Sequence, residues 1–240
     1  MQRLSVYVDS KLLRRPGREK LLHSVKNAKR TRRHRYFGMQ SEDGGDQRVA
    51  TTPKPRWIFV AITGVTNGGK TSLVEHLVEQ FPGTEALHQD LFFRLEKDPK
   101  HEMVPQLNHA NWETLSSVDW DRLLDDLKQR TALPPPEKNR LFIVDGHIVL
   151  NMPRLAALFE RKYFFTLTKE ECFRRRQQRC YEPPDPPGYF DLVVWPMYLS
   201  NKRDVEATVA DVRYLDGAAD MAEIHRLVRD DLEALLKSES

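Results

Sequence analysis

The chain has 240 residues, of which 40% are hydrophobic, so it can bury one core and is somewhat longer than one average domain requires. The formal net charge of +3 hides an asymmetry: residues 1–56 contain 15 lysines and arginines against 5 acidic residues, whereas residues 57–240 carry an excess of seven negative charges. No apolar run approaches the roughly 18 residues of a membrane span, the N-terminus lacks the apolar stretch of a secretory signal, and two cysteines make no disulfide framework. These features exclude membrane-spanning and disulfide-stabilised classes, and we expect an intracellular protein, cytoplasmic by default.

Residues 1–56 have the composition of a basic, disordered extension. Basic clusters at 14–15 and 29–35 precede a polar stretch at 41–46 and a proline pair at 53–55. Charge repulsion and scarce apolar residues disfavour packing into a core. The segment could act as a mitochondrial transit peptide, as a nuclear or nucleic-acid-binding patch, or as a solvated tail.

From Trp57 the composition changes to that of a folded domain, residues 57–240. Residues 57–63 form an apolar run that ends in glycine, which predicts a buried strand. Leu73, Leu77 and Phe81 then recur at helical spacing, and Pro82-Gly83 predicts the end of that helix. The order is strand, glycine loop, helix.

Further strands are predicted at 85–88, 140–146, 162–167 and 211–215, with helices between them. Ser116-x-x-Asp119 and Thr168-x-x-Glu171 are patterns that open helices, and residues 219–236 are amphipathic. Cys172 and Cys180 are expected two turns apart on one helix, too far for a disulfide. Alternating strands and helices predict an α/β fold with a parallel five-stranded sheet flanked by helices.

A phosphate-binding loop is the clearest motif. The pattern Gly64-x4-Gly69-Lys70-Thr71 lies between the predicted strand and helix, which is the setting of a P-loop. Its amide N–H groups and the dipole of the helix can hold phosphate. Lys70 would act on the β- and γ-phosphates of ATP as a catalytic group, and Thr71 would ligate Mg²⁺. The expected ATP-binding residues of the loop are Gly64, Val65, Thr66, Asn67, Gly68, Gly69, Lys70, Thr71 and Ser72.

Two aspartates follow predicted strands. Asp90 comes after the strand at 85–88, where it could orient an acceptor hydroxyl, take its proton or associate with Mg²⁺. Asp145 ends the strand at 140–146, a setting typical of a carboxylate near the metal. Each could instead be a helix cap or a turn residue.

An arginine-rich helix is the candidate lid. Arg174, Arg175, Arg176 and Arg179 precede a proline-rich stretch at 183–188 that forbids further helix. Planar guanidinium groups on one helix face could close over phosphates, and the alternative is a solvated basic helix or a nucleic-acid site. Trp112 and Tyr181 could stack on a flat ring, although most aromatic residues are core or scaffold.

Several stretches together resemble the nicotinamide riboside kinase family, uridine kinase-like P-loop kinases of the nucleoside monophosphate kinase type. They are residues 64–71, Gln89-Asp90-x-Phe92-Phe93, residues 170–176, residues 183–191, Val194-Trp195-Pro196-Met197-Tyr198 and residues 214–217. The resemblance implies ATP- and Mg²⁺-dependent phosphorylation of the ribose 5′-hydroxyl of nicotinamide riboside, and of nicotinic acid riboside, in NAD salvage.

The resemblance also implies roles for individual residues. Asp90 matches the family's general base and its Mg²⁺-associated carboxylate. Thr71 matches the other residue that binds the metal, and Asp145 is a further candidate metal ligand. Arg175 and Arg179 match positions that meet ATP. The implied substrate-binding residues are Asp90, Phe93, Trp112, Glu113, Arg176, Tyr181 and Glu182. The chain departs from the family at Leu91 and Glu113, where Asp is usual, and at Asp145, where Glu is usual.

Other functions remain open at the level of sequence. A kinase for uridine, cytidine or another small alcohol would use the same loop, and a nucleotide-binding interaction protein could keep the fold without turnover. Nucleic acid is expected only as a partner of the basic segment, and no membrane partner is expected.

Overall fold

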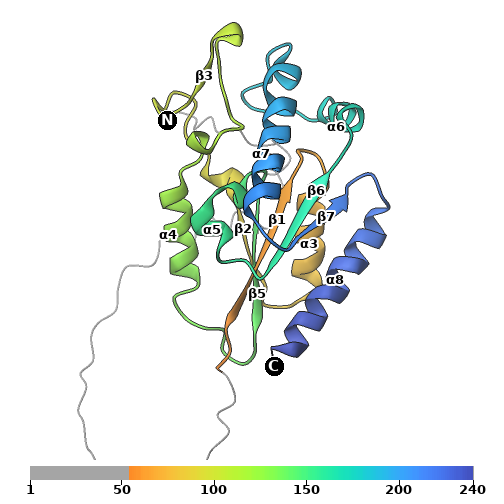
Figure 1. Cartoon of the computed structure of the whole chain (residues 1–240). Helices are drawn as coiled ribbons and strands as arrows, with labels where there is room; N and C mark the ends of the chain where they lie inside the picture. The colour runs from red at the N-terminus through yellow and green to blue at the C-terminus, as the bar shows by residue number, and fades with distance from the viewer. Residues whose placement is uncertain (1–53, 240) are drawn as a thin grey trace, which may run out of the picture.

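The computed structural model describes residues 54–239 (Figure 1). The predicted basic extension therefore lies outside the described residues except for its last three positions. One of these, Arg56, lies 2.7 Å from a carboxylate oxygen of Glu160 and 2.8 Å from one of Glu239. The pair with Glu239 joins the start of the described chain to its C-terminal end.

The centre of the fold is a five-stranded sheet in the order β2-β5-β1-β6-β7, in which every neighbouring pair is parallel. Its strands are β1 (Trp57–Gly64), β2 (Glu85–His88), β5 (Arg140–Asp145), β6 (Arg161–Thr166) and β7 (Val212–Asp216). The predicted α/β fold and five-stranded parallel sheet are thus confirmed, with strand ends within about one residue of the expected ones.

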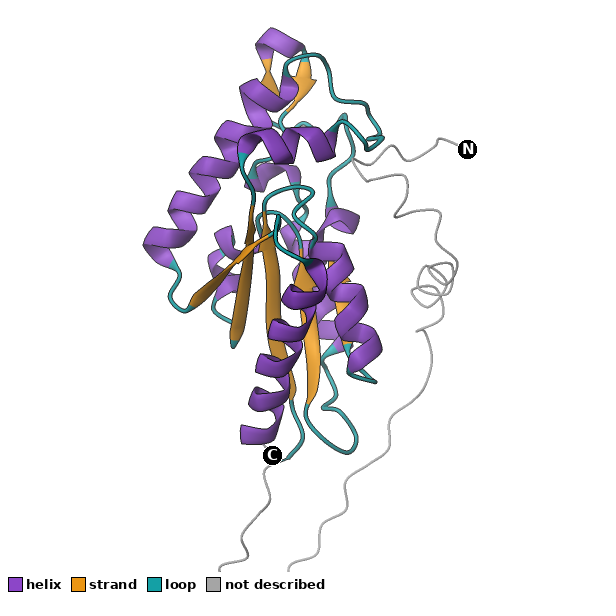
Figure 2. Cartoon of the chain, turned by 90° about the vertical axis from the view of Figure 1, so that its right-hand side faces the viewer, coloured by secondary structure: helices purple, strands orange, loops and turns teal. Residues whose placement is uncertain are grey.

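Helices cover both faces of the sheet, which explains why its central strands β1 and β5 are largely apolar and buried. Helices α3 (Lys70–Gln80) and α8 (Met221–Ser238) lie on one side, and α4 (Trp120–Arg130), α5 (Pro153–Ala156) and α7 (Trp195–Thr208) lie on the other (Figure 1). Turned by 90°, the long strands are seen enclosed by helices (Figure 2). Ile58, Val60 and Ile62 of β1 have no exposed surface, as expected for a central strand buried on both faces.

Two helix ends differ from the prediction. Helix α4 is capped by Asp119, whose side chain accepts from the backbone N–H of Arg122 at 3.3 Å, so the expected cap at Ser116 is wrong. Ser116 instead lies in the 3-10 turn η3 (Leu115–Ser117). Helix α6 (Lys169–Arg176) is capped by Thr168 as predicted but ends earlier than expected, because its last turn tightens into i to i−3 bonds such as that from Arg179 N–H to the Arg176 carbonyl, 3.0 Å.

The early end of α6 corrects two expectations. Arg179 does not share a helix face with Arg175, and the two cysteines are not on one helix. Cys172 is buried within α6, Cys180 lies exposed beyond it, and both are free thiols.

A long helical stretch near the C-terminus was not predicted. The π-helical turn η5 (Phe190–Val194) leads directly into α7, with Pro196 in the first turn. Proline usually argues against helix, but it is tolerated in the first turn of an α-helix, which is where Pro196 lies in α7. Short elements complete the fold: η1 (Gln89–Phe92), β3 (Met103–Val104), η2 (Pro105–Leu107), β4 (His109–Ala110) and η4 (Val149–Asn151).

Gly64, the last residue of β1, provides a test of this packing. Its φ is +106°, and an added Cβ would lie 2.2 Å from the backbone carbonyl oxygen of Phe165. Gly188 has a similar φ of +85°, but a Cβ there would meet only Leu192 Cδ1 at 3.7 Å. We expect Gly64→Ala to lower the free energy of unfolding by about 3 kcal/mol or more, and Gly188→Ala by about 1 kcal/mol.

Denaturant unfolding of the two variants measures this difference. Because both sites have positive φ, the comparison isolates the backbone overlap at Gly64. Equal destabilisation would contradict the proposed close approach of β1 to β6.

Candidate active site

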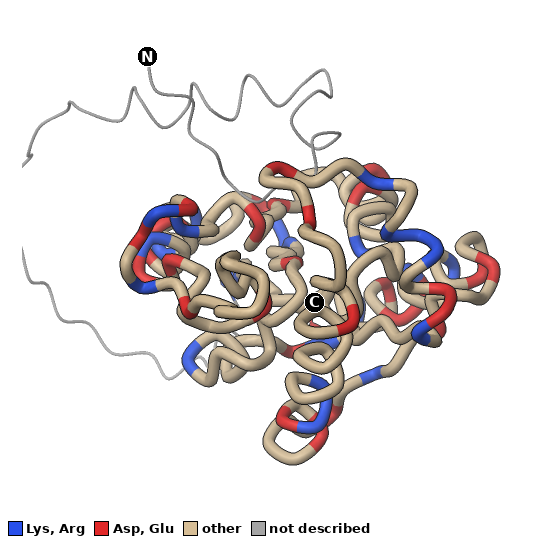
Figure 3. Tube along the Cα trace, turned by 90° about the horizontal axis from the view of Figure 1, so that it is seen from above, with Lys and Arg blue, Asp and Glu red and all other residues tan. Residues whose placement is uncertain are grey.

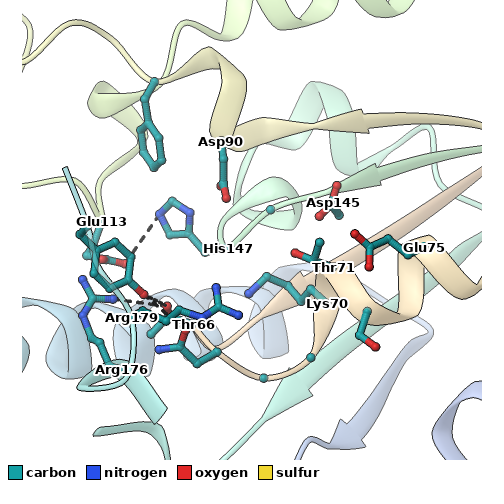
Figure 4. A pocket seen from close by; sticks show the side chains of 17 residues that line it. Thr66, Lys70, Thr71, Glu75, Asp90, Glu113, Asp145, His147, Arg176 and Arg179 are labelled. Atoms are coloured by element: carbon teal, nitrogen blue, oxygen red, sulfur yellow. Dashed lines mark hydrogen bonds and ion pairs between the residues drawn. The ribbon is translucent and has the colours of Figure 1, made fainter. Parts of the chain in front are cut away.

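A cavity of about 390 Å³ opens at the carboxyl ends of the parallel strands. Several chain segments reach it: the P-loop after β1, Asp90 after β2, Asp145 at the end of β5, and the segment after α6 (Figure 4). Carboxyl ends of parallel strands meet at one edge of a sheet, and ligands of such folds bind there. The lining residues are Thr66, Asn67, Gly68, Gly69, Lys70, Thr71, Ser72, Glu75, Asp90, Phe93, Glu113, Asp145, Gly146, His147, Arg176, Arg179 and Tyr181.

The P-loop contributes residues 66–72 to the lining, while Gly64 and Val65 lie buried beneath it. Gly69, with φ 109°, precedes the first residue of α3. The Lys70 ammonium donates to the carbonyls of Gly64 at 3.1 Å and Val65 at 2.7 Å. Burial lowers the pKa of Lys70, and the charges of Asp90 and Asp145 oppose that shift. The loop thus presents a cation, backbone amides and a helix start to one space, the chemistry that binds phosphate.

Side chains that carry oxygen atoms lie at one end of the cavity. Figure 4 shows Thr71, Glu75 and Asp145 there, with Asp90 above Lys70. Burial, and then the nearby charge of Asp145, raise the pKa of Asp90 to about 6, while Lys70 and His88 act in the other direction. Hydroxyl and carboxylate oxygens are the donors that Mg²⁺ prefers, so this set fits the ion that a P-loop kinase uses with ATP.

His88 was predicted only as the end of a strand, but the structure pairs it with Asp145. Its Nδ1 lies 2.5 Å from Oδ1 of Asp145. The two residues are direct neighbours in the parallel register of β2 and β5. That pairing of strands 57 residues apart leaves no signal in the local sequence, so only the fold could place His88 beside Asp145.

Glu113 and His147 form the opposite end of the cavity. Burial raises the pKa of Glu113 to about 7, although Arg176 opposes the shift, and burial lowers the pKa of His147 to about 3. His147 Nε2 lies 3.7 Å from Glu113 Oε2, and the His147 ring lies 5.7 Å from that of Phe93. His147 was not predicted, because a single histidine after a strand carries no motif.

The arginines of the lid segment, defined as residues 169–188, make different contacts. Arg176 is buried and binds Asp185 with two parallel contacts, Nε to Oδ2 at 2.6 Å and Nη2 to Oδ1 at 3.0 Å. Its guanidinium also lies 4.3 Å from the centre of the Tyr181 ring. Arg175 donates to the P-loop carbonyl of Asn67 at 3.2 Å without lining the cavity, whereas Arg179 lines it.

The structure brings most of the predicted substrate residues together, but not all. Asp90, Phe93, Glu113, Arg176 and Tyr181 line the cavity. Two predicted residues do not: Trp112 is fully buried behind Phe93, with ring centres 5.5 Å apart at 88°, and Glu182 is exposed outside. The position of Trp112 is set by its backbone N–H, which donates to the buried Tyr189 hydroxyl at 2.9 Å.

Comparison with known proteins agrees with this geometry. The chain is 34% identical over 197 residues to nicotinamide riboside kinase 2 of Homo sapiens, covering 76% of this chain and 84% of that protein. It is 31% identical over 191 residues to nicotinamide riboside kinase 1 of Rattus norvegicus, covering 75% of this chain and 96% of that protein. The chain belongs to the nicotinamide riboside kinase family.

Membership of this family confirms the resemblance noted from the motifs and marks the chain as a P-loop kinase. A more distant relative, uridine kinase of Bacillus mycoides, is 27% identical over 152 residues, covering 55% of this chain and 69% of that protein. No family model matches the chain.

Within residues 54–239, no helix has the length and apolar character needed to cross a bilayer. Basic and acidic positions are interspersed along this part of the chain when it is seen from above (Figure 3).

The raised pKa of Glu113 predicts a dependence of stability on pH. With a pKa near 4.5 in the unfolded chain and about 7 when folded, Glu113 is protonated in both states below pH 4.5 and has no effect there. Above pH 7 the folded state must hold a buried carboxylate, which costs up to about 3 kcal/mol. We therefore expect Glu113→Gln to raise the Tm at pH 8 and to leave it unchanged at pH 4. Thermal unfolding at both pH values measures the effect, and an equal change at the two would rule out the ionisation of Glu113 as its cause.

The Arg176–Asp185 pair predicts how the lid segment is held. In Asp185→Asn the buried guanidinium loses its counter-charge, which should destabilise the fold by about 3 kcal/mol and raise the KM for the acceptor. The matched control is Asp191→Asn, since Asp191 pairs with exposed Lys169 at 2.7 Å and its loss should cost less than about 1 kcal/mol. Denaturant unfolding and steady-state kinetics of both variants measure the difference, and similar small effects would argue against a structural role for the buried pair.

Proposed function

We propose that the chain phosphorylates the ribose 5′-hydroxyl of nicotinamide riboside, and of nicotinic acid riboside, with ATP as donor, giving the mononucleotide in a salvage route to NAD. The observation that carries the proposal is that a single cavity joins the P-loop to the recess at Glu113, with Asp90 between them. Such a cavity can hold a phosphate donor at one end and the ribose of an acceptor at the other. The similarity to two nicotinamide riboside kinases supports this choice of acceptor.

In this proposal Asp90 is the general base. The 5′-oxygen of the acceptor forms a bond to the γ-phosphorus as the bond to the β,γ-bridging oxygen breaks, and ADP leaves. Asp90 accepts the hydroxyl proton. A pKa of about 6 leaves it ionised at neutral pH while keeping it more basic than an ordinary aspartate.

The remaining residues position and neutralise phosphate. Lys70 and Arg179 line the cavity and offer positive charge to the transferred group. Thr71, Asp90 and Asp145 would hold Mg²⁺, which supplies charge neutralisation on the β- and γ-phosphates. All of these positions lie on the P-loop, at strand ends or beside α6, so the fold orients them before substrate binds.

Aromatic and carboxylate groups would select the acceptor. Phe93 and Tyr181 line the cavity and provide ring surfaces for a pyridine base, so Phe93 takes the place that the sequence suggested for Trp112. Glu113 would accept a hydrogen bond from a ribose hydroxyl. An extra methylene at Glu113 relative to Asp, and one fewer at Asp145 relative to Glu, shift these carboxylates without changing the class of reaction.

Turnover of purified full-length protein tests the proposal. The acceptors are nicotinamide riboside, nicotinic acid riboside and uridine, assayed side by side with ATP and Mg²⁺. We expect preferred turnover of the pyridine ribosides, a fall in kcat of about 10²–10⁴-fold in Asp90→Asn, and no change in Asp125→Asn, an exposed aspartate on α4.

The other outcomes have distinct meanings. Turnover of uridine alone would assign the chain to the pyrimidine nucleoside kinases, whereas absence of turnover with all three acceptors would support a non-catalytic nucleotide-binding role. Full activity in Asp90→Asn would remove Asp90 as the base.

A further inference from the structure

His147 places a polar atom without a hydrogen-bond partner inside the cavity. Among residues 54–239, its Nε2 is buried and makes no hydrogen bond, and Glu113 Oε2 at 3.7 Å is too distant to form one. The side chain of His147 is 14% exposed and that of Glu113 is 9% exposed, so bulk water has little access to either. Polar atoms in such surroundings usually have partners, and one that faces a ligand cavity is therefore a candidate ligand contact.

The position of His147 is held by its neighbours. Its backbone N–H donates to the Oε1 of fully buried Gln89 at 3.2 Å. A Cβ at Gly146 would lie 2.5 Å from atoms of the same Gln89 side chain, so the two segments are in close contact. The ring packs beside Phe93, which also lines the cavity. His147 therefore belongs to a rigid wall of the site.

The unpartnered nitrogen of His147 can act as a hydrogen-bond acceptor toward a ligand in the cavity. The neutral ring has one N–H donor and one bare nitrogen. With the proton on Nδ1, the unpartnered Nε2 is the bare nitrogen and presents an acceptor to the cavity.

We propose that His147 is a specificity-determining residue that accepts a hydrogen bond from one of two adjacent ribose hydroxyls of the acceptor, while Glu113 accepts from the other. The inference rests on the proposed phosphorylation of a riboside. Two acceptors 3.7 Å apart on one wall match two neighbouring O–H donors on one sugar ring. The site then selects ribosides over 2′- and 3′-deoxyribosides.

A purely structural role at this position would not require a histidine. A phenylalanine would fill the same wall beside Phe93 without leaving a buried nitrogen unpaired, and burying such a nitrogen without a partner is unfavourable. The proposed hydrogen bond satisfies the nitrogen when the acceptor binds. It also leaves both buried acceptors unsatisfied when a hydroxyl is missing, which is the physical basis of rejection.

The test compares kcat/KM for nicotinamide riboside with that for its 2′-deoxy and 3′-deoxy forms, and runs the same three forms of uridine in parallel. Wild-type protein should prefer the full riboside by about 10- to 100-fold over the form that lacks the hydroxyl bound by His147. In His147→Phe this preference should fall to within about 3-fold, while the preference at the hydroxyl bound by Glu113 should remain. In His147→Gln, whose amide oxygen can take the place of Nε2, part of the preference should return.

These readouts separate the inference from a structural effect and from the proposed function. A structural role of His147 would lower kcat/KM equally for the riboside and both deoxy forms, and the inference would then be wrong although the proposed function stood. Turnover of uridine but not of the pyridine riboside would overturn the proposed acceptor, and the uridine series would then decide on His147. If wild-type protein used neither riboside, the proposed function and the inference would both be overturned. Should His147→Phe fail to fold, the His147→Gln comparison decides alone: a preference that falls at one hydroxyl and remains at the other supports the inference, and an unchanged preference at both hydroxyls contradicts it.

Discussion

Gly64 lies where strand β1 ends and the phosphate loop begins, directly against the backbone of β6. A Cβ at this position would lie 2.2 Å from the Phe165 carbonyl oxygen, which instead accepts from the N–H of Val65 at 2.9 Å. This close contact turns the chain out of the sheet, so that residues 66–72 face the cavity while Gly64 and Val65 stay buried. The position of Lys70, the start of α3 and the amides of the loop all follow from it.

Burial creates the chemistry of the cavity by shifting charges away from their ordinary states. The pKa values of Asp90 and Glu113 are raised to about 6 and about 7, and that of Lys70 is lowered, in each case first by loss of water. Such groups destabilise the folded chain when ionised, and they interact strongly with a charged or hydrogen-bonding ligand because little water competes. These buried groups thus lower the stability of the folded chain, but they form a site that is already oriented when the ligand binds.

The four arginines of the lid segment have different binding partners. Arg174 and Arg175 both bind Glu171, and Arg176 is held by Asp185, whereas Arg179 beyond the helix end reaches the cavity. The sequence pattern placed these arginines on one candidate lid helix, and the family resemblance implied that Arg175 and Arg179 meet ATP and that Arg176 meets the substrate. The difference arises because α6 ends at Arg176 and the chain then folds back through the proline-rich stretch, which brings Asp185 rather than solvent to the guanidinium.

The amino-acid sequence by itself determined the features that depend on neighbours along the chain. The apolar run of β1, the glycine spacing of residues 64–71 and the cap at Thr168 act over a few residues, and so they predict the strand, the P-loop and the start of α6 correctly. Only the tertiary structure decided which distant residues meet. Pairing of β2 with β5 puts His88 against Asp145, the turn after β5 puts His147 opposite Glu113, and packing behind Phe93 removes Trp112 from the cavity. Each of these contacts joins residues that are far apart along the chain. Such residues meet, and affect one another through burial, charge and hydrogen bonding, only once the sheet has formed.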